Sequence, residues 1–430
     1  MKIILSSGIA AIGLFLQIHV LFAQQVSGPV KVDIQKVNNG YQLLRDGKPY
    51  FVKGAGGRSY ISRLAASGGN SLRTWSTKDA QNILDSAQKN GVTVMMGLSM
   101  ALERHNFNYD DPQAVKKQFE RVKAEVLKYK DHPALLTWGI GNELNLHYKN
   151  PKVWDAVNEV AKMIHEVDPN HPATTVLAGI EKREVEYIKA KCPDIDFLSV
   201  NVYGRLATLP EEVQRVGWTG AYMITEWGPT GHWECLHTEW KTPVEETSSQ
   251  KAAVYMSRYE YSVERDKNCL GSYAFYWGQK QERTPTWYGL FTAKGEETEV
   301  MDVMQYLWSG KWPNNKAPHI YSFQLDQRKA SENIYLKPGK SYAVLAIVSD
   351  PDKDKLTYRY EVLPEPTKLS EGGDPEETPK AVENTLLNNG NNGSISLKSP
   401  DKEGAYRVFV YATDRYNNVA TANIPFYVRK

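Results

Sequence analysis

Two stretches, Leu136-Thr-Trp-Gly-Ile-Gly-Asn-Glu143 and Tyr222-Met-Ile-Thr-Glu-Trp-Gly228, carry the strongest signal for the fold. Each is a short apolar run with a glutamate at or near its end. Apolar runs of this length are typical of strands buried in a parallel sheet. In a β/α barrel, the C-terminal ends of the strands form the mouth where catalytic residues lie. The two runs therefore predict that Glu143 and Glu226 face each other across one barrel mouth.

The segment from residue 53 to residue 312 alternates strand-like runs with helical patterns. Helical spacing is clearest between Val115 and Tyr129, and Asp111-Pro112 is a suitable helix start. Eight β/α units predict a (β/α)8 TIM barrel of the α/β class. A doubly wound open sheet is the alternative, which the strand count and the two terminal carboxylates disfavour. The predicted strands are Phe51–Gly54, Ser71–Arg73, Val92–Leu98, Leu135–Ile140, Ala173–Leu177, Phe197–Val202, Tyr222–Thr225 and Gly271–Tyr276.

The N-terminus has the pattern of a secretory signal peptide. Lys2 precedes an apolar run, and Ala23 lies before a polar Gln-Gln pair, so residues 1–23 are predicted to be removed. An uncleaved membrane anchor is the alternative. We expect a secreted protein, periplasmic or extracellular, with no stable membrane insertion after cleavage. Residues 24–52 contain the turn pairs Asn39-Gly40 and Asp46-Gly47 and are predicted to form a β-hairpin lead-in.

The C-terminal part has a different sequence pattern, with short strand-like runs separated by turn residues. Trp312-Pro-Asn-Asn-Lys-Ala-Pro318 reads as a linker, and residues 313–430 are predicted to form an immunoglobulin-like β-sandwich. Glu371–Gly393 is predicted to be a long surface loop. All eleven tryptophans lie at or before Trp312, which favours a structural domain over a carbohydrate-binding module. The predicted strands are Ile334–Leu336, Tyr342–Val348, Leu356–Val362, Ser394–Leu397, Tyr406–Ala412 and Val419–Val428.

Composition excludes several classes of partner. Lys plus Arg is 52 and Asp plus Glu is 50, a net charge of +2, so no electrostatic argument favours nucleic acid or an anionic membrane. The three cysteines, Cys192, Cys235 and Cys269, lack paired zinc spacing and are expected to be free thiols. We predict no metal and no cofactor, and we expect a monomer whose partner is a polysaccharide or oligosaccharide substrate.

Two groups of potential metal ligands occur in the sequence. His232, Glu234, Cys235 and His237 match no zinc spacing, and a sugar-contact loop explains them better. Asp350, Asp352 and Asp354 alternate as in a calcium loop, but Lys355 follows where that loop needs glycine. We therefore expect a hairpin turn there.

Paired carboxylates on facing strands suit the hydrolysis of a glycosidic bond. One carboxylic acid protonates the leaving oxygen, and the other attacks the sugar carbon or activates water. A separation of about 5–5.5 Å gives retention of configuration and about 6.5–9.5 Å gives inversion. By strand count, Glu143 follows the fourth strand and Glu226 follows the seventh, on opposite walls of the barrel.

These residues also carry a family resemblance. Asp131-His-Pro-Ala-Leu-Leu-Thr-Trp-Gly-Ile-Gly-Asn-Glu143 resembles the acid/base motif of clan A glycoside hydrolases, closest to the barrel of the β-galactosidase and β-glucuronidase family. Ile224-Thr-Glu226-Trp-Gly resembles the nucleophile strand of that clan. The resemblance covers the barrel and implies a retaining enzyme, with Glu143 as acid/base and Glu226 as nucleophile.

The same resemblance implies roles for four further residues. Asn142 would bind the sugar 2-hydroxyl, and Arg73 would contact the nucleophile and keep it ionised. Tyr203 would donate to the nucleophile, and Trp277 would form the platform under the cleaved sugar. Trp233 is chosen by position alone: it and Trp227 lie beside the Glu226 strand, and we expect Trp233 to stack on a neighbouring sugar and core packing to compete for Trp227.

Enzymes of the galactosidase type carry sandwich domains before the barrel, whereas in this chain the predicted sandwich follows the barrel. A signal peptide, a barrel and a trailing sandwich are similar to glycoside hydrolase family 158, whose members are endo-β-1,3-glucanases. The predicted function is therefore cleavage of a β-glucan, as an endo-β-1,3-glucanase. The alternatives are a β-mannanase or exo-acting β-glycosidase of the same clan, a glycan-binding protein on an inactive barrel, and a surface scaffold built around the sandwich.

Overall fold

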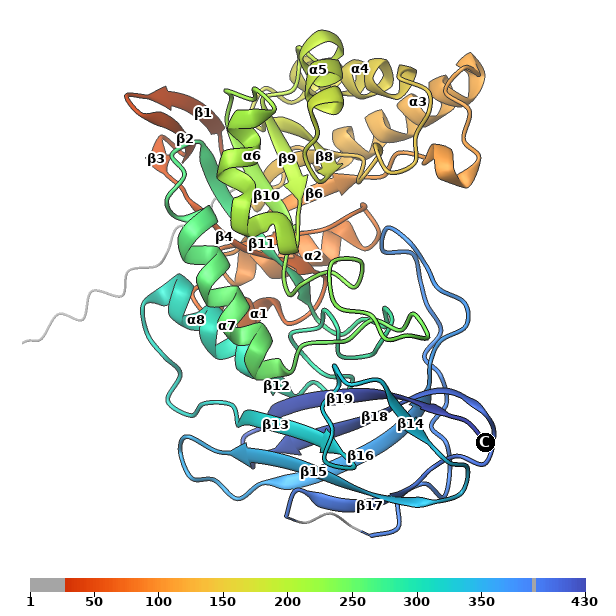
Figure 1. Ribbon diagram of the computed structural model, residues 1–430. Helices are drawn as coiled ribbons and strands as arrows, with labels where there is room; N and C mark the ends of the chain where they lie inside the picture. The colour runs from red at the N-terminus through yellow and green to blue at the C-terminus, as the bar shows by residue number, and fades with distance from the viewer. Residues whose placement is uncertain (1–27, 389–391) are drawn as a thin grey trace, which may run out of the picture.

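The computed structural model describes residues 28–388 and 392–430, and the predicted signal peptide lies outside them. The chain folds into a β/α barrel and a β-sandwich that lies against it (Figure 1). None of the helices in the described residues has both the length and the apolar character needed to cross a membrane.

Eight parallel strands close the barrel, in the order β10-β11-β4-β5-β6-β7-β8-β9. The predicted TIM barrel is therefore confirmed, and the open-sheet alternative is wrong. The predicted strands match the observed ones to within a few residues at each end, because strands buried on both faces are almost continuously apolar. The strands are β4 (Val52–Gly57), β5 (Ser71–Arg73), β6 (Thr93–Leu98), β7 (Leu135–Ile140), β8 (Ala173–Ala178), β9 (Phe197–Asn201), β10 (Tyr222–Trp227) and β11 (Cys269–Trp277).

Helices surround the barrel and turn an apolar face towards it. Helix α3 begins at Pro112, where the Asp111 carboxylate accepts hydrogen bonds from the backbone N–H groups of Gln113 and Ala114 at 2.9 and 3.2 Å. The helices are α1 (Ile61–Ala66), α2 (Ala80–Lys89), α3 (Pro112–Tyr129), α4 (Lys152–Val167), α5 (Lys182–Lys191), α6 (Leu209–Arg215), α7 (Ser248–Arg258) and α8 (Glu299–Ser309). Shorter helical turns are η1 (Glu103–His105), η2 (Gly204–Thr208) and η3 (Tyr259–Val263).

A small antiparallel sheet closes the bottom of the barrel. It comprises β1 (Val32–Val37), β2 (Gly40–Arg45) and β3 (Lys48–Pro49). Its Val32 and Leu43 join an apolar cluster with residues inside the lower barrel, such as Met95 and Phe197. The hairpin predicted for this region thus acts as a plug, which leaves the opposite end of the barrel as the open mouth.

The C-terminal part consists of two sheets that share one apolar core. One sheet has the order β13-β15-β17, and the other has β12-β19-β18-β16 with β14 also paired to β19. This order is compatible with an immunoglobulin-type sandwich, which stays a prediction. The strands are β12 (Glu297–Thr298), β13 (His319–Leu325), β14 (Ile334–Leu336), β15 (Ser341–Ser349), β16 (Thr357–Pro364), β17 (Ser394–Lys398), β18 (Gly404–Thr413) and β19 (Asn418–Val428).

Strand β18 turns alternate side chains to the two sides of its sheet. Val408 and Val410 enter the sandwich core, whereas Arg407 faces the barrel. The Arg407 guanidinium is 1% exposed and donates to Glu365 Oε1 at 2.8 Å, to Asn423 Oδ1 at 2.6 Å and to the carbonyl of Pro243 at 2.7 Å. Because Pro243 follows barrel strand β10, this buried cation fastens the sandwich to the barrel.

We predict that Arg407→Met lowers the free energy of unfolding by about 3–5 kcal/mol, because it leaves buried acceptors and a carboxylate without their cation. Chemical denaturation followed by tryptophan fluorescence measures the change. Arg328→Met is the matched control in the same domain, since Arg328 pairs with Asp326 at the surface and should cost about 0–1 kcal/mol. Equal effects of the two substitutions would contradict the role of Arg407 as a buried fastener.

Candidate active site

Polar side chains converge at the mouth from four strands. Arg73 ends β5, Glu143 follows β7, Asn201 ends β9 and Glu226 lies near the end of β10. All four positions are at the C-terminal ends of parallel strands, so their side chains meet at one edge of the barrel. Backbone geometry alone therefore brings the two predicted carboxylates and the predicted arginine together.

Glu226 is held by three donors and is 6% exposed. Arg73 Nη1 donates to Oε1 at 2.7 Å and Trp75 Nε1 donates to the same oxygen at 2.6 Å. Tyr203 Oη donates to Oε2 at 2.9 Å. A buried carboxylate with a cation and two further donors is stabilised in its ionised form. Glu226 is thus fixed in one orientation by these three hydrogen bonds.

Glu143 occupies a different environment, half-buried and close to the same charge. Its backbone has φ +53°, in the left-handed region, and its N–H donates to the carbonyl of Val176 at 2.9 Å. Burial raises the pKa of Glu143 to about 7 and the negative charge of Glu226 adds to the rise, while a hydrogen bond from Asn201 and the cations of Arg73 and Arg104 oppose it. Glu143 can therefore hold a proton near neutral pH, which suits an acid.

A chain of amide groups connects the two carboxylates. Arg73 Nη2 donates to Asn142 Oδ1 at 2.6 Å, and Asn201 Nδ2 lies 3.2 Å from the same oxygen and 2.9 Å from Glu143 Oε1. Thr225 Oγ1 orients Asn201 through a 2.8 Å bond to its Oδ1. Because Oδ1 of Asn142 is used in this chain, its Nδ2 group is left to donate to a substrate hydroxyl.

Tyr203 can serve only as a donor in this site. Burial raises the pKa of Tyr203 well above its ordinary value, and the charge of Glu226 adds to the rise. The phenol therefore keeps its proton and its hydrogen bond to Glu226. Trp233 lies edge-on to the Tyr203 ring at 5.5 Å and is 56% exposed, so part of its ring is open to solvent beside Tyr203.

Trp277 does not lie where the predicted platform must be. Its ring is fully buried against Phe291 and Trp308, and its Nε1 donates to the carbonyl of Tyr60 at 3.2 Å. No ring face is left for a sugar, so the prediction for Trp277 is wrong. The half-buried Tyr276, one residue earlier, lies 5.8 Å from the Trp75 ring and is the aromatic that borders the mouth.

Sequence reasoning named no role for Trp75, Asn201, Arg104 or Tyr276. Trp75 and Asn201 had a usable signal, since each lies within two residues of a predicted site residue at a strand end. Arg104 had none, because it lies in the short helical turn η1 after β6, away from any strand end. Only the folded chain brings Arg104 into the electrostatic field of Glu143.

The model of "Glycosyl hydrolases family 2, TIM barrel domain" matches residues 64–278, half of the chain. The chain belongs to glycosyl hydrolase family 2. The match includes every polar residue described above at the mouth. It gives no support to the narrower resemblance to family 158. No curated protein matches the chain.

Solved structures share the fold of this family 2 protein at low identity. The Faecalibacterium prausnitzii β-glucuronidase is 18% identical, with a TM-score of 0.51, over 65% of this chain and 52% of that chain. The Ruminococcus gnavus β-glucuronidase is 15% identical, with a TM-score of 0.52, over 66% and 53%. The Bacteroides uniformis β-glucuronidase is 14% identical, with a TM-score of 0.51, over 93% and 48%. The family 2 chain thus spans about half the length of these structures.

The loop after β10 braces the mouth of the family 2 barrel. The Glu234 carboxylate accepts the N–H groups of Gly204 and Gly231 at 2.7 and 3.0 Å. His232 Nε2 lies 3.4 Å from Glu282. The residues that resembled a metal cluster in the sequence therefore bind separate partners.

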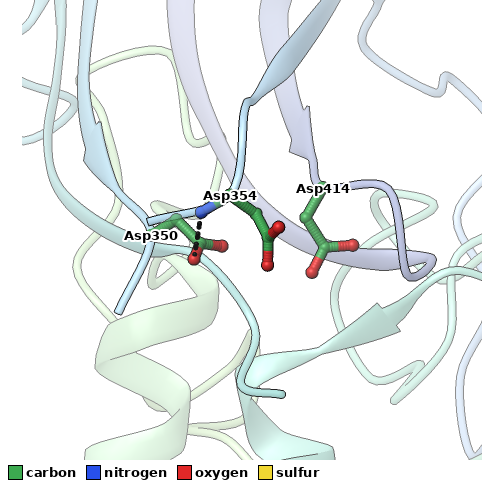
Figure 2. Close-up of side chains that lie close together, drawn as sticks. All are labelled: Asp350, Asp354 and Asp414. Atoms are coloured by element: carbon green, nitrogen blue, oxygen red, sulfur yellow. Dashed lines mark hydrogen bonds between the residues drawn. The ribbon is translucent and has the colours of Figure 1, made fainter. Parts of the chain in front are cut away.

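An acidic cluster lies instead in the sandwich, where Asp350, Asp354 and Asp414 approach one another (Figure 2). Asp350 accepts the N–H groups of Asp352 and Asp354 at 2.8 and 3.0 Å, so the chain turns here, but the predicted hairpin is wrong because β15 and β16 on either side of the turn lie in different sheets. Arg415 Nε lies 3.0 Å from Asp354 and already supplies positive charge. Within the described ranges this is the one acid, histidine or cysteine grouping compact enough for a cation, and acid spacing alone does not make it a binding site.

The state of Glu143 predicts a basic limb in the pH profile. Glu143 must be protonated to donate, so kcat/KM should fall as pH rises through about 7. Arg104→Met removes a cation that favours the ionised form and should move this limb to higher pH. Stopped assays from pH 5 to 9 measure the shift, with Arg121→Met at the surface of α3 as control. A limb that moves to lower pH would contradict the assignment of Glu143 as the acid.

Proposed function

We propose that the protein is a retaining, exo-acting β-glycosidase that removes single sugars from chain ends by double displacement. The observation that carries the proposal is the unequal treatment of two facing carboxylates. Glu226 accepts hydrogen bonds from Arg73, Trp75 and Tyr203, whereas burial and the charge of Glu226 raise the pKa of Glu143 to about 7. Environments that push two acids apart assign one as nucleophile and the other as acid.

The first half of the reaction follows from this pair. A Glu226 oxygen attacks the anomeric carbon as the Glu143 proton moves to the glycosidic oxygen, so the bond to the leaving group breaks and a glycosyl ester of Glu226 forms. Asn142 Nδ2 donates to a hydroxyl of the bound sugar, since its Oδ1 is occupied. Tyr203 and Trp75 keep Glu226 in line with the anomeric carbon.

In the second half of the reaction, Glu143 acts as a base instead of an acid. Its carboxylate removes a proton from water, and the resulting oxygen attacks the anomeric carbon and releases Glu226. Two inversions give net retention. Ionised Glu143 recovers its proton from water in this step, and the rise in its pKa returns when Glu226 regains its negative charge.

Membership of family 2 and the names of the solved neighbours support the exo-acting alternative over the endo-β-1,3-glucanase prediction. β-Glucuronides are the first substrates to test, followed by β-galactosides, β-glucosides and β-mannosides. The export signal at residues 1–23 remains part of the proposal, and it would place the enzyme where it meets glycans outside the cytoplasm.

We predict that Glu226→Gln and Glu143→Ala each abolish most of the hydrolysis of p-nitrophenyl β-glycosides. Loss of base catalysis at Glu143 should cost about 10²–10⁴-fold in kcat, because water must be activated in the second step, whereas p-nitrophenolate leaves in the first step without a proton. Azide should rescue Glu143→Ala and give a β-glycosyl azide, because the nucleophile is intact. Glu184→Gln is the control, since Glu184 is a buried barrel carboxylate outside the mouth. An α-azide product would reassign Glu143 as the nucleophile.

The mode of attack is tested by the products from a panel of oligosaccharides and polysaccharides, including laminarin. An exo-enzyme should release one monosaccharide from the first minutes, in the β-configuration by proton NMR. A ladder of oligosaccharides from laminarin would instead restore the endo-glucanase alternative. Specific binding with no turnover of any member would support the glycan-binding alternative.

A further inference from the structure

The loop predicted to run over the surface of the sandwich reaches back to the barrel mouth. It leaves the sandwich after β16 and rises beside the barrel at the right of Figure 1. We name residues 365–377 the strap. Its base is fixed, because Glu365 accepts from the buried Arg407 at 2.8 Å and its N–H donates to the carbonyl of Ala405 at 3.0 Å. The strap thus begins from the same buried fastener that joins the two domains.

The strap contacts the loops that follow three barrel strands. After β6, Arg104 donates to the carbonyl of Glu371 at 3.3 Å and His105 lies 3.0 Å from Asp374. After β7, His147 lies 2.9 Å from the Glu371 carboxylate. After β11, Arg283 forms an ion pair with Glu376, whose side chain is fully buried.

The tip of the strap lies across the mouth. A Cβ added at Gly372 would lie 2.8 Å from Leu146 Cδ2 and closer still to Arg104, and one at Gly373 would lie 3.4 Å from Lys280 Nζ. These neighbours come from loops after β6 and β7 on one side and after β11 on the other. In the closed strand order, β4 and β5 lie between β11 and β6. The strap therefore bridges the half of the mouth above β4 and β5, where Arg73 and Trp75 lie.

The two halves of the mouth differ in character. Trp75 and the half-buried Tyr276 lie on the bridged half, with Phe275 packed against both rings and Lys280 above the Phe275 ring. Trp233 is exposed on the opposite half, beyond Tyr203. A terminal sugar suits the bridged half, because aromatic rings there offer apolar contact in a confined space. The leaving group suits the open half.

We infer that the strap walls off the glycone side of the cleft and restricts cleavage to the terminal sugar of a chain. This inference rests on the proposed glycosidase function and deepens it, because it names the segment that makes the enzyme exo-acting. The wall comes from the sandwich rather than from a barrel loop. The C-terminal domain thus takes part in selecting substrate without a binding face of its own.

The geometry of the strap allows a clean deletion. The Ser370 N–H and hydroxyl donate to Glu376 Oε1 at 3.0 and 3.2 Å, so the two ends of the tip already meet. Replacement of residues 371–375 by two glycines removes the tip and keeps the ion pair of Glu376 with Arg283. A second variant, Glu371→Gln/Asp374→Asn, keeps the length of the tip but weakens its contacts with the histidines and Arg104. Glu377→Gln is the matched control on the exposed side of the strap.

The probe is a p-nitrophenyl oligosaccharide blocked at its non-reducing end by a 4-O-benzyl group. It is built from the sugar whose p-nitrophenyl glycoside the wild type hydrolyses fastest. An exo-enzyme cannot cleave the blocked probe, whereas an open cleft can. We expect no cleavage by the wild type or by Glu377→Gln. The tip deletion should raise kcat/KM on the blocked probe at least about tenfold relative to the simple glycoside, since specificity here depends on a steric block.

Of two outcomes that would overturn the inference, the first would also overturn the exo action in the proposed function, and the second would overturn the inference alone. One is cleavage of the blocked probe by the wild type. The other is a tip deletion that hydrolyses the simple glycoside and still rejects the blocked probe. If the deletion fails to fold by circular dichroism, the double variant decides by the same ratio, with a smaller expected rise. Failure of the proposed function is distinct, because the wild type would then hydrolyse no glycoside in a Glu226-dependent manner.

Discussion

Arg73 carries its charge into the floor of the barrel mouth, where it is 2% exposed. Its guanidinium donates to the Glu226 carboxylate, to the carbonyl of Thr225 and to the amide oxygen of Asn142. A buried cation is stable only if its partners surround it. The ends of β5, β7 and β10 are therefore tied to one group. The orientation of Glu226 and the free amide of Asn142 both follow from this single side chain, and Asn201 joins the same network through its bond to Asn142.

The two carboxylates are alike in chemistry and opposite in surroundings. Glu226 accepts a hydrogen bond from the Arg73 cation, whereas burial and the negative charge of Glu226 raise the pKa of Glu143. Glu143 also has a left-handed backbone, a conformation that costs an ordinary residue about 1–2 kcal/mol. The backbone strain at Glu143 and the raised pKa of its carboxyl group persist because the closed barrel holds this residue in place. The site is thus stabilised by the scaffold rather than by its own contacts.

Much of the barrel and the central pair of acids could be predicted, because buried parallel strands read as apolar runs and their polar ends are conspicuous. Three features could not. Strand β13 (His319–Leu325) was missed, since its alternating exposure follows directly on a proline-rich linker. Trp277 is buried away from the mouth, and Tyr276 lies beside Trp75 instead, because a run of aromatics does not reveal which ring turns towards the mouth. The reach of the strap depends on contacts between residues more than 200 positions apart, such as His147 with Glu371, which no local pattern encodes.

The two-residue strand β12 has a consequence for how this chain can be divided. It precedes the linker at Trp312, yet it pairs with β19 at Asn418 and Val419 and so completes a sheet of the other domain. Glu297 in this strand also binds Arg63 at the bottom of α1 through a double hydrogen bond. A cut at the linker would leave β19 with a bare edge, and bare edges recruit other strands. The barrel and the sandwich are therefore not interchangeable modules. The linker separates them in the sequence, but the sheet that contains β12 and β19 extends across that boundary. A chimera joined at the linker would expose the edge of β19 and would be prone to aggregate.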